Sequence, residues 1–297
     1  EFANEVARRH FDKCIKRGEL VIKEVRGLEN YLAVKHRGVI ITANHFNAFD
    51  NYAVFKAIQK ELGKKRLYKI IREGNYTTFP GIYGYFFRHC NTLPLSADHR
   101  AFRELRDAIG VLLARGEKIL IYPEQSMWWN YRKPRKCPLY TTMTQILTAE
   151  QVEAMTADEI NSAIRKAMEY DEYRYQKENG IRITEPFRAQ GLHKVLYQCP
   201  HCGTEFSMNS EGAELFCEAC GKRWLWQEDG YLKALEGETE FDHIPDWFNW
   251  ERQQVKKQIE EGTYSFEDEV EVLSLPRIWR YIPLGKAKLT HSIEDGF

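Results

Sequence analysis

The chain has 297 residues, of which 43% are hydrophobic and 29% are charged, a balance that excludes a disordered or fibrous protein and suits about two globular domains. No apolar run approaches the ~20 residues of a membrane-spanning helix, so the sequence predicts no such segment. The net charge is zero, but residues 1–136 carry 26 basic and 14 acidic side chains, which indicates an anionic partner or two oppositely charged domains that dock on each other.

Strands and helices alternate along residues 1–140, which predicts an α/β domain with a largely parallel sheet flanked by helices. Short apolar runs predict buried strands, and apolar side chains at helical spacing predict helices. The predicted strands are residues 38–42, 67–71 and 118–122, and the predicted helices are residues 4–16, 48–62 and 101–114. Ligands of such sheets bind beyond the carboxyl ends of the strands, so polar residues that follow a strand are candidates for a site.

The sequence changes in character after residue 136. Residues 141–195 predict a helical connector, in which Thr148 and Thr156 begin helices and Glu159 completes a capping box with Thr156. A compact cysteine-rich module comes next, at residues 196–226. Residues 227–297 form an acidic, aromatic segment for which the sequence predicts no particular fold.

Two polar motifs come directly after predicted strands. His45 leaves the strand at residues 38–42, and Asp50 lies near the start of the next helix. In that arrangement the carboxylate accepts a hydrogen bond from one imidazole nitrogen and makes the other nitrogen a better base. A chance pair on a polar loop is the alternative interpretation. Glu124, which comes after Pro123 and the strand at residues 118–122, points to the same edge or belongs to the first turn of a helix.

Residues 20–136 resemble the glycerolipid acyltransferase family, which includes lysophosphatidate acyltransferases. The blocks that carry the resemblance occur in the order of the family motifs. They are VRGLEN at residues 25–30, NHFNAFD at 44–50, RE at 72–73 with PG at 80–81, LPL at 93–95 and YPEQS at 122–126. The NHFNAFD block matches the NH-x4-D motif of the family, and YPEQS matches its F-P-E-G-T block.

The resemblance implies an O-acyltransferase that moves a fatty acyl group from acyl-CoA or acyl-carrier protein to the hydroxyl of a lysophosphatidate-like lysophospholipid. His45, oriented by Asp50, would be the general base. The resemblance also implies a set of residues that bind substrate, namely Asn44, Arg72, Glu124, and Arg88 or Arg100 in place of an arginine that the family has near residues 96–97.

The chain departs from the family pattern after the YPEQS block. The family continues with a helix and a V-P-V-type strand, and neither is predicted after residue 136. Either that segment is missing or the sheet is truncated. The alternative to the enzyme is therefore a catalytically inactive, acyltransferase-derived protein that binds lipid or acts as a scaffold.

Residues 127–136 (MWWNYRKPRK) combine aromatic and basic side chains. Beside a site that takes lipid, this mixture predicts a loop at a membrane surface, with the aromatic rings at the headgroup level and the cations on anionic lipid. We therefore expect a cytoplasmic, peripheral protein at the inner face of the membrane. The same mixture suits single-stranded nucleic acid, or the tryptophans pack in a core while solvent surrounds the cations.

Four cysteines form the pattern C-x2-C-x14-C-x2-C, namely Cys199, Cys202, Cys217 and Cys220. This spacing places four thiolates around one structural Zn²⁺, so the module resembles a zinc ribbon. Phe206 and Trp224 are expected to form its apolar shell. Acidic residues flank the module, which makes nucleic acid an unlikely partner and favours a role in stabilising the fold or in contacting a protein.

Overall fold

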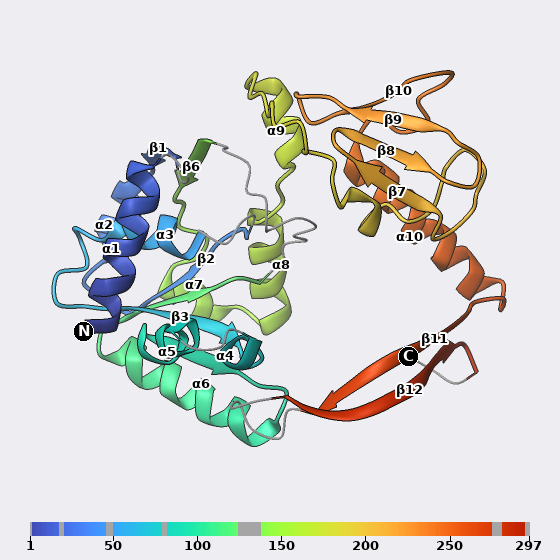
Figure 1. The fold of residues 1–297 in the computed structure, drawn as a ribbon. Coiled ribbons are helices and arrows are strands. Elements are labelled where there is room, and N and C mark those ends of the chain that lie inside the picture. The colour runs from blue at the N-terminus through green and yellow to red at the C-terminus, as the bar shows by residue number, and fades with distance from the viewer. Residues whose placement is uncertain are drawn as a thin grey trace. The chain divides into compact units, whose positions relative to one another are not determined.

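The computed structural model describes residues 2–17, 21–45, 50–78, 82–123, 138–274 and 281–294. The chain divides into two compact units, of which the first contains most of the chain up to residue 169 and the second contains most of residues 170–273 (Figure 1). Within the described ranges, no helix is both long and apolar enough to cross a membrane.

The first unit is built on a four-stranded sheet that is parallel throughout, with the strand order β2-β5-β3-β4. Its strands are β2 (Val39–Thr42), β3 (Leu67–Arg72), β4 (Thr92–Leu95) and β5 (Lys118–Ile121). The three strands predicted from apolar runs are confirmed, and β4 joins them. The whole protein is thus of the mixed α/β class, as predicted, with parallel strands flanked by helices.

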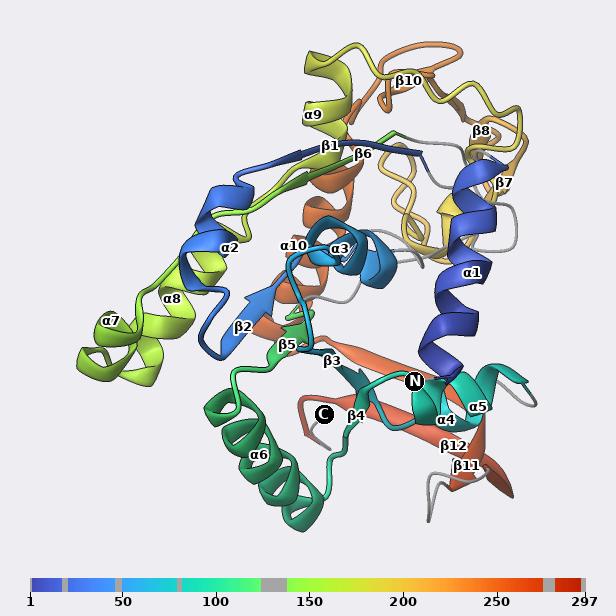
Figure 2. The ribbon, with the colours of Figure 1, turned by 90° about the vertical axis from the view of Figure 1, so that its left-hand side faces the viewer.

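Helices lie on both sides of this sheet, because connections between parallel strands must cross over it. Figure 2 shows α3 on one side and α6 on the other. The helices are α1 (Phe2–Lys16), α2 (Leu28–Val34), α3 (Asp50–Ile58), α4 (Asn75–Thr78), α5 (Ile82–His89) and α6 (His99–Ala114). The helix predicted at residues 48–62 ends earlier, because the amides of Glu61 and Leu62 both turn back to the carbonyl of Ile58.

A second, two-stranded parallel sheet pairs β1 (Val21–Arg26) with β6 (Pro138–Thr142). Strand β6 was not predicted from the sequence. Proline is tolerated as the first residue of a strand, and threonine favours strands, so the segment can pair once a partner is available. That partner lies at the other end of the unit's sequence, where a local pattern does not reveal it.

Two short helices complete the first unit, α7 (Ala149–Ala154) and α8 (Ala157–Ala167). Both begin as the sequence predicts, with Thr148 and Thr156 as N-caps, and Glu159 completes the predicted capping box. The boundary expected at residue 140 lies inside β6, and α7 and α8 group with the parallel sheets rather than with the second unit.

The second unit contains an antiparallel sheet of order β10-β9-β8-β7, which packs against a long helix around buried tryptophans. Its elements are α9 (Glu172–Glu178), η1 (Leu192–Lys194), β7 (Met208–Glu211), β8 (Glu214–Cys217), β9 (Arg223–Trp226), β10 (Leu232–Ala234) and α10 (Ile244–Glu260). Two long, mostly exposed strands, β11 (Ser265–Ser274) and β12 (Ile282–Ser292), pair with each other.

Lys118 is a fully buried cation at the start of the central strand β5. Its ammonium group donates to three backbone carbonyls, those of Lys35, Arg37 and Gly116, at 2.6–2.9 Å. These bonds fasten the turn between α2 and β2 to the neighbouring strand. Lys118 therefore helps to hold β2 in place, in addition to the backbone pairing of β2 with β5.

We expect Lys118→Met to lower the free energy of unfolding by about 2 kcal/mol or more, since it fills the same space but leaves three buried carbonyls without their donor. Thermal or urea unfolding measures this change. The exposed Lys64→Met is the matched control and should stay within about 0.5 kcal/mol of the original chain. Equal effects of the two substitutions would show that the hydrogen bonds from Lys118 to these carbonyls do not contribute to stability.

Candidate active site and candidate metal centre

The candidate active site lies at the carboxyl edge of the four-stranded sheet. Thr42 pairs in parallel with Ile121, so β2 and β5 end side by side. His45 comes after β2, and Tyr122 comes directly after β5. Their rings stack, with centroids 4.3 Å apart and planes 28° from parallel.

Asp50 begins α3 and is buried, with its residue only 5% exposed. Its Oδ2 lies 3.0 Å from Nδ1 of His45. The sequence predicts that these two side chains come together, and the structure places them in contact. A carboxylate on Nδ1 selects the tautomer in which Nε2 is the ring nitrogen that accepts a proton.

Tyr122 is a residue of this site that the sequence reasoning did not select. Burial raises the pKa of its phenol far above the usual value, and the negative charge of Asp50 adds to the effect. The hydroxyl is buried and has no hydrogen-bond partner in the described part of the chain. The sequence signal that could have identified Tyr122 is its position as the first residue after β5, at the same sheet edge as His45. The ring is a flat wall that restricts how the imidazole can turn.

Asn44, which the resemblance implies to bind substrate, makes a side-chain contact within the chain. Its Nδ2 donates to the carbonyl of Met168 at 3.0 Å, and Met168 is the C-cap of α8. The residue directly before His45 therefore ties the loop after β2 to the end of α8.

The arginines predicted to bind substrate differ in their positions. Arg72 ends β3 at the same edge as His45, and two strand spacings separate their strands, about 10 Å. Arg88 reaches back to the carbonyl of Tyr76 at 3.4 Å. Arg100 lies on exposed α6, where its guanidinium pairs with Glu104 at 3.1 Å. Of these arginines, only Arg72 is placed at the strand ends.

Some predicted features lie outside the described residues. These are Glu124 and the aromatic, basic stretch at residues 127–136. They stay predictions from the sequence.

The candidate metal centre consists of Cys199, Cys202, Cys217 and Cys220, whose sulfur atoms all lie within 4.8 Å of one another. Two of the sulfur–sulfur distances are 3.8 Å and 3.7 Å. An ion such as zinc, bound by four thiolates at about 2.3 Å in a tetrahedron, separates its sulfur atoms by about 3.8 Å. The four side chains therefore fit a metal ion, as the spacing predicts.

The two cysteine pairs have the same backbone geometry. The amides of Gly203 and Gly221 each donate at 2.9 Å to the carbonyl of the first cysteine of their pair. Both glycines have a left-handed backbone, with φ of 76° and 77°, which other residues adopt at a cost. This repetition explains why a glycine stands directly after each pair in the sequence.

The apolar shell of the metal centre differs from the prediction. Trp224 is fully buried, as expected, and makes an edge contact with Trp247 of α10 at 5.0 Å. The expectation that Phe206 joins this shell is wrong, because Phe206 is 68% exposed and stacks on Tyr197. Tryptophans from the neighbouring sheet and helix fill the space instead. His201, which lies between Cys199 and Cys202 in the sequence, has its Nδ1 3.2 Å from Oε1 of Glu240.

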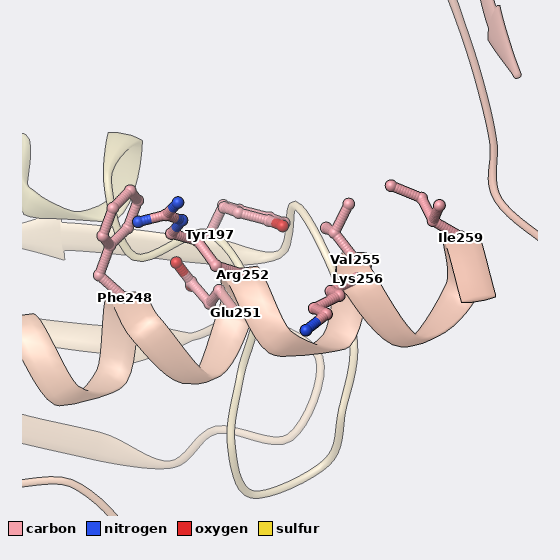
Figure 3. Close-up of a pocket in the computed structure, with 7 residues that line it drawn as sticks. All are labelled: Tyr197, Phe248, Glu251, Arg252, Val255, Lys256 and Ile259. Carbon is pink, nitrogen blue, oxygen red and sulfur yellow. The ribbon is translucent and has the colours of Figure 1, made fainter. Parts of the chain in front are cut away.

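Helix α10 holds the segment that leads into Cys199. Trp247 Nε1 donates to the carbonyl of Gln198 at 3.0 Å, and Oε1 of Glu251 accepts from the amide of Gln198 at 2.9 Å. Figure 3 shows Glu251 among the residues that line a pocket of about 280 Å³ on α10, beside Tyr197 and Arg252. Burial raises the pKa of the Glu251 carboxyl to about 8, although the amides that donate to it act in the opposite direction.

Comparisons of the chain with models of protein families, with curated proteins and with solved structures find no match.

We expect Cys217→Ser to abolish stoichiometric metal binding, because it removes one of four ligands and the other three cannot close the tetrahedron. Elemental analysis of the purified chain, together with its melting temperature, measures the loss. The control is Cys90→Ser, which changes a buried cysteine of the first unit and should keep the metal. Full metal content in Cys217→Ser would contradict the assignment.

We also expect Glu251 to make the stability of the second unit fall as the pH rises from about 4.5 to about 8. Within this window the folded chain holds a proton on Glu251 that the unfolded chain releases, so folding binds a proton and higher pH opposes it. Glu251→Gln carries no charge at any pH and should remove this part of the decline.

The measurement is the melting temperature of the metal-loaded chain and its variant at several pH values. The melting temperature of Glu251→Gln minus that of the original chain should increase steadily as the pH rises. Glu236 is exposed, and Glu236→Gln serves as the control. Its melting temperature should differ from that of the original chain by the same amount at every pH. A constant difference for Glu251→Gln as well would show that the carboxyl does not titrate in this range.

Proposed function

We propose that the chain is an O-acyltransferase of the glycerolipid acyltransferase type, which transfers a fatty acyl group from a thioester to the hydroxyl of a lysophospholipid. The observation that carries the proposal is the contact between His45 and Asp50 at the carboxyl edge of a parallel sheet. The order of the sequence blocks at residues 25–126 supports it independently.

The geometry suits general-base catalysis. An alcohol is a poor nucleophile at neutral pH, and a positioned base accelerates its attack by about 10²–10⁴-fold. In the proposed step, the acceptor oxygen attacks the thioester carbonyl carbon while its proton passes to Nε2 of His45. The carbon–sulfur bond then breaks, and the leaving thiolate takes the proton back from the imidazolium. The charge of Asp50 stabilises that imidazolium on its other side.

The acceptor and donor are proposed by chemical class. A lysophosphatidate-like acceptor carries a phosphate, for which Arg72 at the same sheet edge is the best placed of the described candidates. Arginine suits phosphate because its planar fork offers two parallel donors. Acyl-CoA and acyl-carrier protein are the two donor classes, and both present a thioester.

We further propose that the four-cysteine centre binds zinc in a structural role. All four ligands come from the chain, which leaves no open position for a substrate. Reduced cysteines suit a reducing compartment, and a lipid substrate suits peripheral attachment to the inner face of a membrane. Both points support the cytoplasmic, membrane-surface location that the sequence predicts.

The deciding experiment measures acyl transfer from hexadecanoyl-CoA, and separately from hexadecanoyl acyl-carrier protein, to lysophosphatidate in detergent micelles. We expect turnover that falls by about 10²–10⁴-fold in His45→Ala, because the base is lost. Asp50→Asn should also lose about 10² or more, because an amide holds the wrong tautomer.

The matched control is His99→Ala, which removes an exposed imidazole at the start of α6 and should leave turnover unchanged. Turnover that persists in His45→Ala would exclude His45 as the base. No turnover with either donor by the folded, metal-loaded chain would favour the inactive lipid-binding or scaffold protein instead.

A further inference from the structure

A large cavity lies within the first unit, beside β2. Its volume is about 920 Å³, within the range of small-molecule sites. Strand β2 and helix α3 contribute one wall, through side chains such as Ile41 and Val54. Helix α8 contributes another, through Ile160 and Ile164. We call this space the β2–α8 chamber.

The chamber reaches the candidate active site. Asn44 and Asp50, the residues on either side of the His45 loop, both line it. Met168 also lines it, and the bond from Asn44 to the Met168 carbonyl joins the two walls at that end. His45 itself is not among the residues that line the chamber. An apolar ligand there would have one end beside Asp50, on the Nδ1 side of the His45 ring.

The residues that line the chamber indicate which class of ligand it can bind. Aliphatic side chains from the sheet and from α8 line much of the chamber. The chamber is partly open to solvent, because Ile40 and Val152 of its lining are 51% and 46% exposed.

Among the charged residues of the lining, Arg37 and Glu150 are exposed and pair with each other at 3.7 Å. Glu153 of the lining is exposed as well, whereas the buried Asp50 lies at the active-site end. Away from these charges, the aliphatic side chains suit a hydrocarbon chain.

We propose that the β2–α8 chamber holds the fatty acyl chain of the thioester, and that Ile160 and Ile164 of α8 determine the chain length that fits. This inference rests on the proposed acyltransferase function. It assigns a specificity role to a segment, residues 143–168, that lies outside every sequence block of the resemblance.

The geometry of α8 supports a role in chain length. Ile160 and Ile164 are four residues apart, so they lie on one face of the helix and point to the same side. Ser162, between them, is exposed and lies outside the chamber. One helix therefore offers both the test positions and a matched control position.

The first test measures binding without catalysis. The 297-residue chain is titrated with a dansyl-labelled undecanoic acid, which is then displaced by hexadecanoic acid in detergent-free buffer. We expect Ile164→Trp, which narrows the chamber at α8, to weaken hexadecanoic acid binding by about tenfold or more. Ser162→Trp should bind as the original chain does. Equal binding by Ile164→Trp and the original, or equal weakening by Ser162→Trp, would overturn the proposal.

The second test uses a variant that enlarges the chamber, so that a folding defect of the tryptophan variant does not decide the question. In the acyl transfer assay, Ile164→Ala should shift the ratio of turnover numbers toward chains longer than the original prefers, and Ile164→Trp should shift it toward butanoyl-CoA. Unchanged ratios in both folded variants would overturn the assignment of α8.

The two tests separate this inference from the proposed function. Fatty acid binding that responds to Ile164→Trp, in a chain without turnover, would support the chamber and reject the enzyme. Turnover that requires His45, with no fatty acid binding and no change in acyl-chain preference, would support the enzyme and reject the chamber as the acyl site. Another segment of the protein would then occupy the chamber.

Discussion

The parallel pairing of β2 with β5 determines where His45 and Tyr122 lie, because each residue comes after its strand at the same edge of the sheet. The stack of their rings and the contact of Asp50 with Nδ1 then fix the imidazole from two directions. Lys118 supports this pairing, because its ammonium group bonds to the turn before β2. The charge of a buried lysine thus stabilises the backbone geometry on which the candidate base relies.

Local patterns in the sequence predicted much of this arrangement. Short apolar runs located three of the four strands, and threonine caps located α7 and α8, because these signals act over a few residues. The contact of His45 with Asp50 was predictable for the same reason. The bond from Asn44 to the Met168 carbonyl was not predictable, because these residues are 124 positions apart and meet only through tertiary packing. Strand β6 was missed because its partner, β1, is distant in sequence.

The metal module shows the same division between local and distant signals. Cysteine spacing and the two glycines predicted the four-sulfur cluster, since each knuckle is a local turn. The sequence did not reveal that α10 belongs to the module. Such a small sheet buries little apolar surface, so it needs further support. Trp247 and Glu251 supply it by holding both peptide groups of Gln198, the residue before the first cysteine.

Asn44 connects the chamber to the catalytic loop in the proposed enzyme. Its side chain bonds to the end of α8, and its backbone leads directly into His45. An acyl chain that packs against α8 would hold that helix in place, and the same hydrogen bond would then hold the loop that carries the base. Binding energy from the unreactive part of a substrate can in this way support the reacting groups, which raises the rate rather than affinity alone. The length of the acyl chain and the rate of catalysis would thus be coupled through the side-chain amide of Asn44.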